Sequence, residues 1–126
     1  MAANKTFNFG PVALTNTLTT NILNTNITSL AGPVGFTATQ LFIILRHIRI
    51  VNKHASIAAK ASLWKGATGG NVAGTEFIWF QTAVALGSFI EAYGIWRLDS
   101  TDFLVGGSDT ATALTIEGEG EIGVSG

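Results

Sequence analysis

The sequence predicts an all-β fold, an antiparallel β-sandwich of the jelly-roll or immunoglobulin-like type. Fifteen glycines divide the chain into short segments, and threonine and β-branched residues are frequent within them. Apolar side chains alternate along these segments and show little of the 3.6-residue period of a helix. A length of 126 residues suits one domain, which we place at residues 11–126 behind an extended N-terminal arm at residues 1–10.

The first third of the chain is expected to contribute the arm, one strand and one loop. Residues 1–10 hold too few apolar side chains to order themselves, and Phe7 and Phe9 are candidates to anchor them on a neighbouring subunit. Pro11 to Leu23 is expected as the first strand because its leucine and isoleucine side chains share one face. Residues 24–38 are expected to form a long loop because glycine and proline interrupt them.

The strongest predicted strand runs from Thr39 to Asn52. Its apolar residues fall on both faces, with Phe42, Ile44, Ile48 and Ile50 on one and Leu41, Ile43, Leu45 and Val51 on the other. A strand that is apolar on both faces lies in the centre of a fold or at a subunit interface. After a polar turn, Ser56 to Lys65 is expected to pair with it as an antiparallel hairpin.

Further strands and turns are expected in the second half of the chain. Residues 66–74 indicate a loop by their glycine content, and strands are predicted at Glu76 to Val84 and at Ser88 to Leu98. Aspartate and serine indicate a turn at residues 99–102. Residues 106–110 are expected to form another loop.

The last predicted strand, Ala111 to Val124, alternates strictly. Leu114, Ile116, Gly118, Gly120 and Ile122 lie on one face, opposite Glu117, Glu119 and Glu121. The three glutamates need solvent or basic partners, and their charge discourages edge-to-edge aggregation. Five bases of the predicted hairpin are candidate partners, within the same subunit or from a neighbouring one, although a solvated face explains them equally well. These bases are Arg46, Arg49, Lys53, Lys60 and Lys65.

The composition is poor in charge for a chain of this size. Only 12% of the residues are charged, 47% are hydrophobic, and the mean hydropathy is +0.40. An average composition supplies about twice as many charges, so much of the surface is expected to be buried against a protein partner. The net charge of −1 gives no general attraction to nucleic acid or to an anionic membrane. The longest uninterrupted apolar run, Leu41 to Leu45, is too short to span a membrane.

Few residues are suited to catalysis or metal binding. The chain has no cysteine, and its two histidines, His47 and His54, have no acidic residue close by in sequence, so both are expected to be structural. The glycine loop lacks the Gly-Lys-Ser/Thr ending of a phosphate-binding loop. Alternate carboxylates on a strand point in parallel and do not converge on a calcium ion. We therefore expect no enzyme activity, no catalytic residue, no cofactor and no metal site.

The large aromatic residues allow two interpretations. Trp64, Trp79, Trp96 and Tyr93 are of the type that stacks on sugars, but large aromatics in a small β-domain more often lie in a core or at an interface. The low charge favours a protein interface. The candidate interface residues are Phe7, Phe9, Leu41, Ile43, Leu45, Trp64, Trp79 and Trp96.

Several stretches between residues 40 and 124 resemble small β-sandwich structural proteins of tailed bacteriophages. The resemblance rests on strand and turn segments: Leu45-Arg46-His47-Ile48-Arg49-Ile50-Val51-Asn52, Leu63-Trp64-Lys65-Gly66-Ala67-Thr68-Gly69-Gly70, Ala73-Gly74-Thr75-Glu76, Trp96-Arg97-Leu98, Thr101-Asp102-Phe103-Leu104-Val105-Gly106 and Ala113-Leu114-Thr115-Ile116. It implies a non-enzymatic virion component, with no family catalytic residues to carry over.

From this resemblance we expect a capsid decoration (cement) protein, made in the host cytoplasm without a signal peptide and carried on the virion. Its expected partners are the major capsid protein and copies of itself, as a homo-oligomer for which a trimer is one option; nucleic acid and membrane are not expected partners. A minor capsid or tail accessory protein of the same sandwich type is one alternative. A carbohydrate-binding module that uses Trp64, Trp79 or Trp96 is another.

Overall fold

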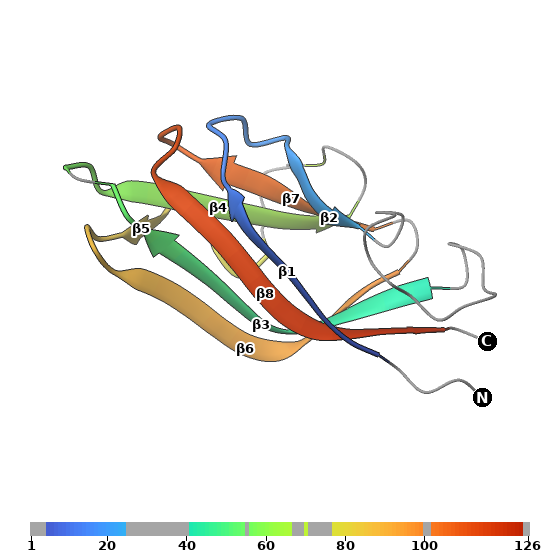
Figure 1. Cartoon of the computed structure of the whole chain (residues 1–126). Coiled ribbons are helices and arrows are strands. Elements are labelled where there is room, and N and C mark those ends of the chain that lie inside the picture. The colour runs from blue at the N-terminus through green and yellow to red at the C-terminus, as the bar shows by residue number, and fades with distance from the viewer. Residues whose placement is uncertain are drawn as a thin grey trace.

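The computed structural model describes residues 5–24, 41–54, 56–66, 70, 77–99 and 102–124. These residues form eight β-strands and no helix, which confirms the all-β prediction. The strands make two four-stranded antiparallel sheets that pack face to face as a sandwich (Figure 1). Within the described ranges there is no helix long and apolar enough to cross a membrane.

The strand order is that of a jelly roll. Sheet A contains, in order, β1 (Lys5–Ala13), β8 (Leu114–Val124), β3 (Leu41–Asn52) and β6 (Phe89–Leu98). Sheet B contains β2 (Asn21–Asn24), β7 (Phe103–Ser108), β4 (Ala59–Gly66) and β5 (Thr82–Val84). The pairs β1–β8, β2–β7, β3–β6 and β4–β5 are nested around the middle of the chain. Of the two sandwich types that the sequence allows, this nesting is the jelly roll.

A β-bulge at Arg46 determines which side chains of β3 enter the core. Leu45 pairs with Gly120 and His47 with Glu119, so Arg46 is an extra residue relative to β8. The predicted faces of this strand are therefore wrong, because the bulge shifts the alternation by one residue. The core-facing residues of β3 are Ile43, Leu45, Ile48 and Ile50, all fully buried.

The predicted hairpin between the third and fourth strands is wrong. β3 belongs to sheet A and β4 to sheet B, so the connection after Asn52 crosses from one sheet to the other. The Asn52 side chain fixes this crossing, since its Nδ2 donates to the carbonyl oxygens of Ile57 and Val84 and its Oδ1 accepts from the His54 amide. Hydrophobic alternation identified both strands but not the partner of each.

The first predicted strand is also divided differently. Residues 5–10, expected as an arm, run along β8 as the first part of β1, and residues 1–4 lie outside the described residues. The predicted continuous strand from Pro11 to Leu23 is wrong, because a turn separates β1 from β2. The Thr20 hydroxyl donates to the Thr17 carbonyl oxygen within this turn, a side-chain contact that the apolar pattern does not reveal.

The second half of the chain has one strand more than expected. β7 replaces part of the predicted loop at residues 106–110, and its Gly106 and Gly107 are buried. A Cβ atom on Gly106 would collide with the Ser62 carbonyl oxygen of β4, so glycine here permits close strand approach rather than a turn.

The remaining predictions divide between confirmed and undescribed segments. β6 and β8 confirm the predicted strands at Ser88 to Leu98 and Ala111 to Val124, with shorter ends. The strand predicted from Glu76 is reduced to the three residues of β5. The predicted loop at 24–38, apart from Asn24, and most of the loop at 66–74 lie outside the described residues.

Candidate functional site

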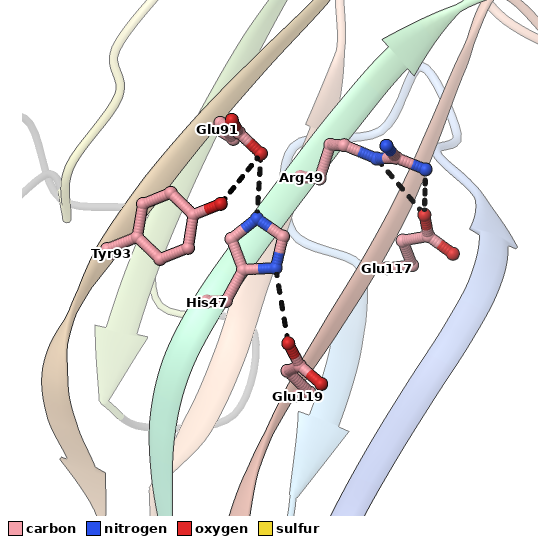
Figure 2. Close-up of polar contacts among 6 residues, drawn as sticks. All are labelled: His47, Arg49, Glu91, Tyr93, Glu117 and Glu119. Carbon is pink, nitrogen blue, oxygen red and sulfur yellow. Dashed lines mark hydrogen bonds and ion pairs between the residues drawn. The ribbon is translucent and has the colours of Figure 1, made fainter.

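The outer face of sheet A carries a row of mutually paired polar side chains. Three neighbouring strands supply them: three glutamates come from β8, the bases from β3, and a fourth glutamate, Glu91, comes with Tyr93 from β6 (Figure 2). The bulge directs both Arg46 and His47 to this face, where regular alternation would place only one of them. The central position of β3 in this row brings each base within reach of a carboxylate on an adjacent strand.

His47 is the centre of the row. Its Nε2 donates to Glu91 Oε2 at 2.9 Å, and its Nδ1 lies 3.7 Å from Glu119 Oε1 (Figure 2). The imidazole stacks on the Tyr93 ring with a centroid distance of 4.4 Å and an interplanar angle of 15°. The Tyr93 hydroxyl donates to the same Glu91 oxygen at 3.5 Å. The acidic partners that are missing from the local sequence are thus supplied by β6 and β8.

Two arginines pair with the glutamate row of the same chain. Arg49 donates to Glu117 Oε1 from Nη2 at 2.6 Å and from Nε at 3.1 Å. Arg46 donates from Nε to Glu121 Oε2 at 2.7 Å. Of the two explanations that the sequence leaves open, intramolecular pairing therefore applies to Arg46 and Arg49.

The predicted group of five bases does not form one patch. Lys60 and Lys65 lie on β4 in the other sheet, and Lys53 is exposed beyond the end of β3. Lys65 Nζ donates to the Arg97 carbonyl oxygen at 2.8 Å, where the end of β4 approaches β6. This separation leaves no extended basic surface among the described residues.

Shallow hollows lie along the same outer face. One of about 330 Å³ is bordered by His47, Arg49 and Asn8, and one of about 360 Å³ by His47, Arg46 and Tyr93. A third, of about 490 Å³, lies beside Arg49 and Phe89. Mostly polar atoms line the first hollow, and mostly apolar atoms line the other two.

The polar partners of His47 are two carboxylates, and no serine or threonine hydroxyl bonds to it within the described chain. In the described ranges, no group of three or more histidine, cysteine, aspartate or glutamate side chains is arranged so that it could hold a metal ion. His54 is structural, since its Nδ1 accepts the backbone amides of Ser56 and Ile57.

The candidate interface residues have different surroundings. Phe9, Ile43, Leu45 and Trp64 are buried within the chain itself. Trp79 and Trp96 are half-buried against the core, and Trp96 packs edge-on against Phe77 at 5.6 Å. The side chains of Phe7 and Leu41 lie outside the described part of the structure.

The exposed apolar residues are others, and of these only Tyr93 was singled out from the sequence, as a candidate for stacking on sugars. Most lie between residues 78 and 95, and the two most exposed, Tyr93 and Ile95, are each 71% accessible on β6. Successive residues of a strand face opposite sides of the sheet, so an inward-facing Trp96 places Tyr93 and Ile95 on the outward side. This alternation was the available signal in the sequence. The exposed large apolar residues of this stretch are Ile78, Phe80, Leu86, Phe89, Tyr93 and Ile95.

Comparisons of the chain with protein-family models, curated proteins and solved structures find no match.

Proposed function

We propose that the chain is a non-enzymatic structural subunit of a bacteriophage virion, a decoration protein that oligomerises on the capsid and stabilises contacts between major capsid subunits. The observation that carries the proposal is the exposed apolar stretch at residues 78–95. Large apolar side chains at this exposure are costly for an isolated subunit and favourable at an interface. Jelly rolls include viral capsid proteins, which supports the proposal by analogy of fold.

The low charge of the chain is consistent with repeated contacts. Each copy on a symmetric shell makes the same contacts as every other, so weak apolar contacts sum over the particle. The charges of sheet A are used within the subunit, as the Arg46–Glu121 and Arg49–Glu117 pairs illustrate. Attachment to the capsid is therefore expected to depend on apolar contact more than on salt.

Binding to capsids that lack the protein tests the proposal. Purified chain is expected to co-sediment with such capsids, and Leu86→Ser is expected to weaken binding about tenfold, since it removes one buried aliphatic side chain. Val12→Ser is the matched control, because Val12 is similarly exposed, at 40% against 47%, but lies on β1 at the opposite edge of sheet A. Absence of co-sedimentation at saturating protein would refute the capsid role.

Copy number separates a head protein from a tail protein. Cryo-electron microscopy of the intact particle is expected to show the subunit repeated over the head surface. Restriction to the tail, in few copies, would support the tail accessory alternative instead. Location and stoichiometry come from the same reconstruction.

Carbohydrate binding is the second candidate, and Tyr93 favours it. Its ring is highly exposed, is stacked on His47, and borders a shallow hollow that Arg46 and Glu119 also line, an arrangement that suits stacking on a sugar. The tryptophans proposed for this role are buried or half-buried. A glycan array tests it: binding that is lost in Tyr93→Ala and retained in Tyr93→Phe supports a lectin. An array without signal counts against it.

A further inference from the structure

Strand β6 is a long edge strand with exposed apolar side chains. Among the described residues only β3 pairs with it, and it ends sheet A (Figure 1). Exposed and less exposed residues alternate without a break along its ten residues. Lys65 of β4 bonds to the Arg97 carbonyl oxygen near the end of β6, and the register with β3 shifts at Gly94 and Ile95. The strand itself holds no proline or lysine, so an edge of this length is a template for another strand.

The outward residues of β6 are symmetric in character about Gly94. Tyr93 and Ile95 flank this glycine by one residue on either side, and Glu91 and Arg97 flank it by three. An antiparallel pair of β6 strands centred on Gly94 would therefore place Tyr93 opposite Ile95 of the second copy. The same register would place Glu91 opposite Arg97 of the second copy.

We propose that two copies of the chain associate through their β6 strands, antiparallel about a two-fold axis at Gly94, and join their A sheets into one continuous sheet. Each contact occurs twice by symmetry, as in any isologous interface. The pairing covers the two most exposed apolar side chains of the described chain and sets two opposite charge pairs across the junction. It deepens the self-association that the proposed function includes, and a dimer that does not bind capsids would refute the capsid role alone.

The charged atoms of β6 are available for this pairing. His47 and Tyr93 both bond to Oε2 of Glu91, so its Oε1 can accept from a second copy. Arg97 donates to Asp99 Oδ1 from Nε, which leaves its two terminal nitrogens to donate to a carboxylate. The Arg97 guanidinium also lies over the Phe42 ring at 4.1 Å, which holds it near the strand.

Charge reversal tests the register, with sedimentation equilibrium as the measurement. Purified chain is expected to form a dimer. Glu91→Arg alone would set like charges opposite each other twice, as would Arg97→Glu alone, and each is expected to weaken dimerisation about tenfold or more. An equimolar mixture of the two variants is expected to restore the dimer, because the heterodimer regains both opposite pairs. Lys60→Glu, an exposed reversal on β4 in the other sheet, is the control.

Disulfide trapping is the second readout. Because the chain has no native cysteine, any disulfide must involve the introduced residues. A mixture of Tyr93→Cys and Ile95→Cys chains is expected to cross-link faster than either variant alone, because these residues are opposite only between copies. Circular dichroism confirms that each variant is folded. A chain that stays monomeric at millimolar concentration, or a mixture that does not recover the dimer, would overturn the proposal.

Discussion

Asn52 is the polar residue that the interior depends on most. It is fully buried, and all three of its side-chain hydrogen bonds lie between 2.9 and 3.0 Å. Its partners come from the crossing that follows β3 and from β5, so one amide joins sheet A to sheet B. A buried amide with complete partners specifies geometry, whereas its removal leaves several buried backbone groups without partners.

Asn52→Ala is expected to lower the free energy of unfolding by about 2–4 kcal/mol, because two carbonyl oxygens and one amide lose their partner. Urea denaturation followed by circular dichroism measures the change. Asn16→Ala, at an exposed position in the β1–β2 turn, is expected to stay within about 0.5 kcal/mol. Equal effects of the two substitutions would contradict the assignment of Asn52 as the link between the sheets.

At the scale of elements, β8 is the strand on which sheet A is built. It lies between β1 and β3, and its inward residues include Gly118 and Gly120. A Cβ atom on Gly118 would lie 2.5 Å from the Phe9 ring, so this glycine makes room for a core side chain. A Cβ atom on Gly120 would collide with the Ile44 carbonyl oxygen of β3, which cannot move aside as a side chain can.

Gly120→Ala is therefore expected to destabilise the fold by about 1–3 kcal/mol through overpacking against the backbone. Glu119→Ala is the control on the next residue, because Glu119 faces outward and its side chain is 67% exposed. It is expected to change stability by less than about 0.5 kcal/mol. Thermal unfolding of the pair tests the prediction, which a neutral Gly120→Ala would refute.

The ion pairs across β3 and β8 are expected to contribute little to stability. The Arg49 and Glu117 side chains are 40% and 37% exposed, so solvent screens their attraction. Arg49→Gln is expected to cost less than about 1 kcal/mol, and less still in high salt. Chemical denaturation in low and high salt measures both values. A large loss that salt does not alter would show that the packing of Arg49 on the Phe89 ring, 5.6 Å away, stabilises the fold more than the ion pair does.

At the scale of the whole molecule, the nested pairing makes the first and last strands partners. β1 and β8 lie at opposite ends of the sequence and pair with each other. β3 pairs with β8 along most of the length of β3. Of the strand pairs in sheet A, only β3–β6 can form before the C-terminal strand is present. The fold is thus expected to be cooperative over all of its strands, as non-local β topologies are.

A chain that ends at Ala113 lacks β8 and is expected not to fold. β1 and β3 would lose their common partner, and apolar residues such as Phe9 and Ile43 would lose their cover. Limited proteolysis and circular dichroism of the truncated chain test this. Retention of a cooperative unfolding transition would show that sheet B and the remaining strands are stable alone.

Local patterns determine a substantial part of this protein. The all-β class, the strict alternation of β8, and the outward row of Glu117, Glu119 and Glu121 all follow from side-chain period and residue type. The local sequence around His47 holds no acid, and this says nothing about the environment of its ring. Its partners, Glu91 and Glu119, are more than forty residues away in sequence.

The tertiary structure alone decided which distant segments pair with one another. The division of strands between two sheets, the nested jelly-roll order and the polar row around His47 depend on pairings between remote strands, and a period of two carries no information about them. The bulge at Arg46 belongs here too, since it exists only relative to β8. Alternation therefore determined that strands form. Long-range packing decided their neighbours, and with them the exposed edge at β6.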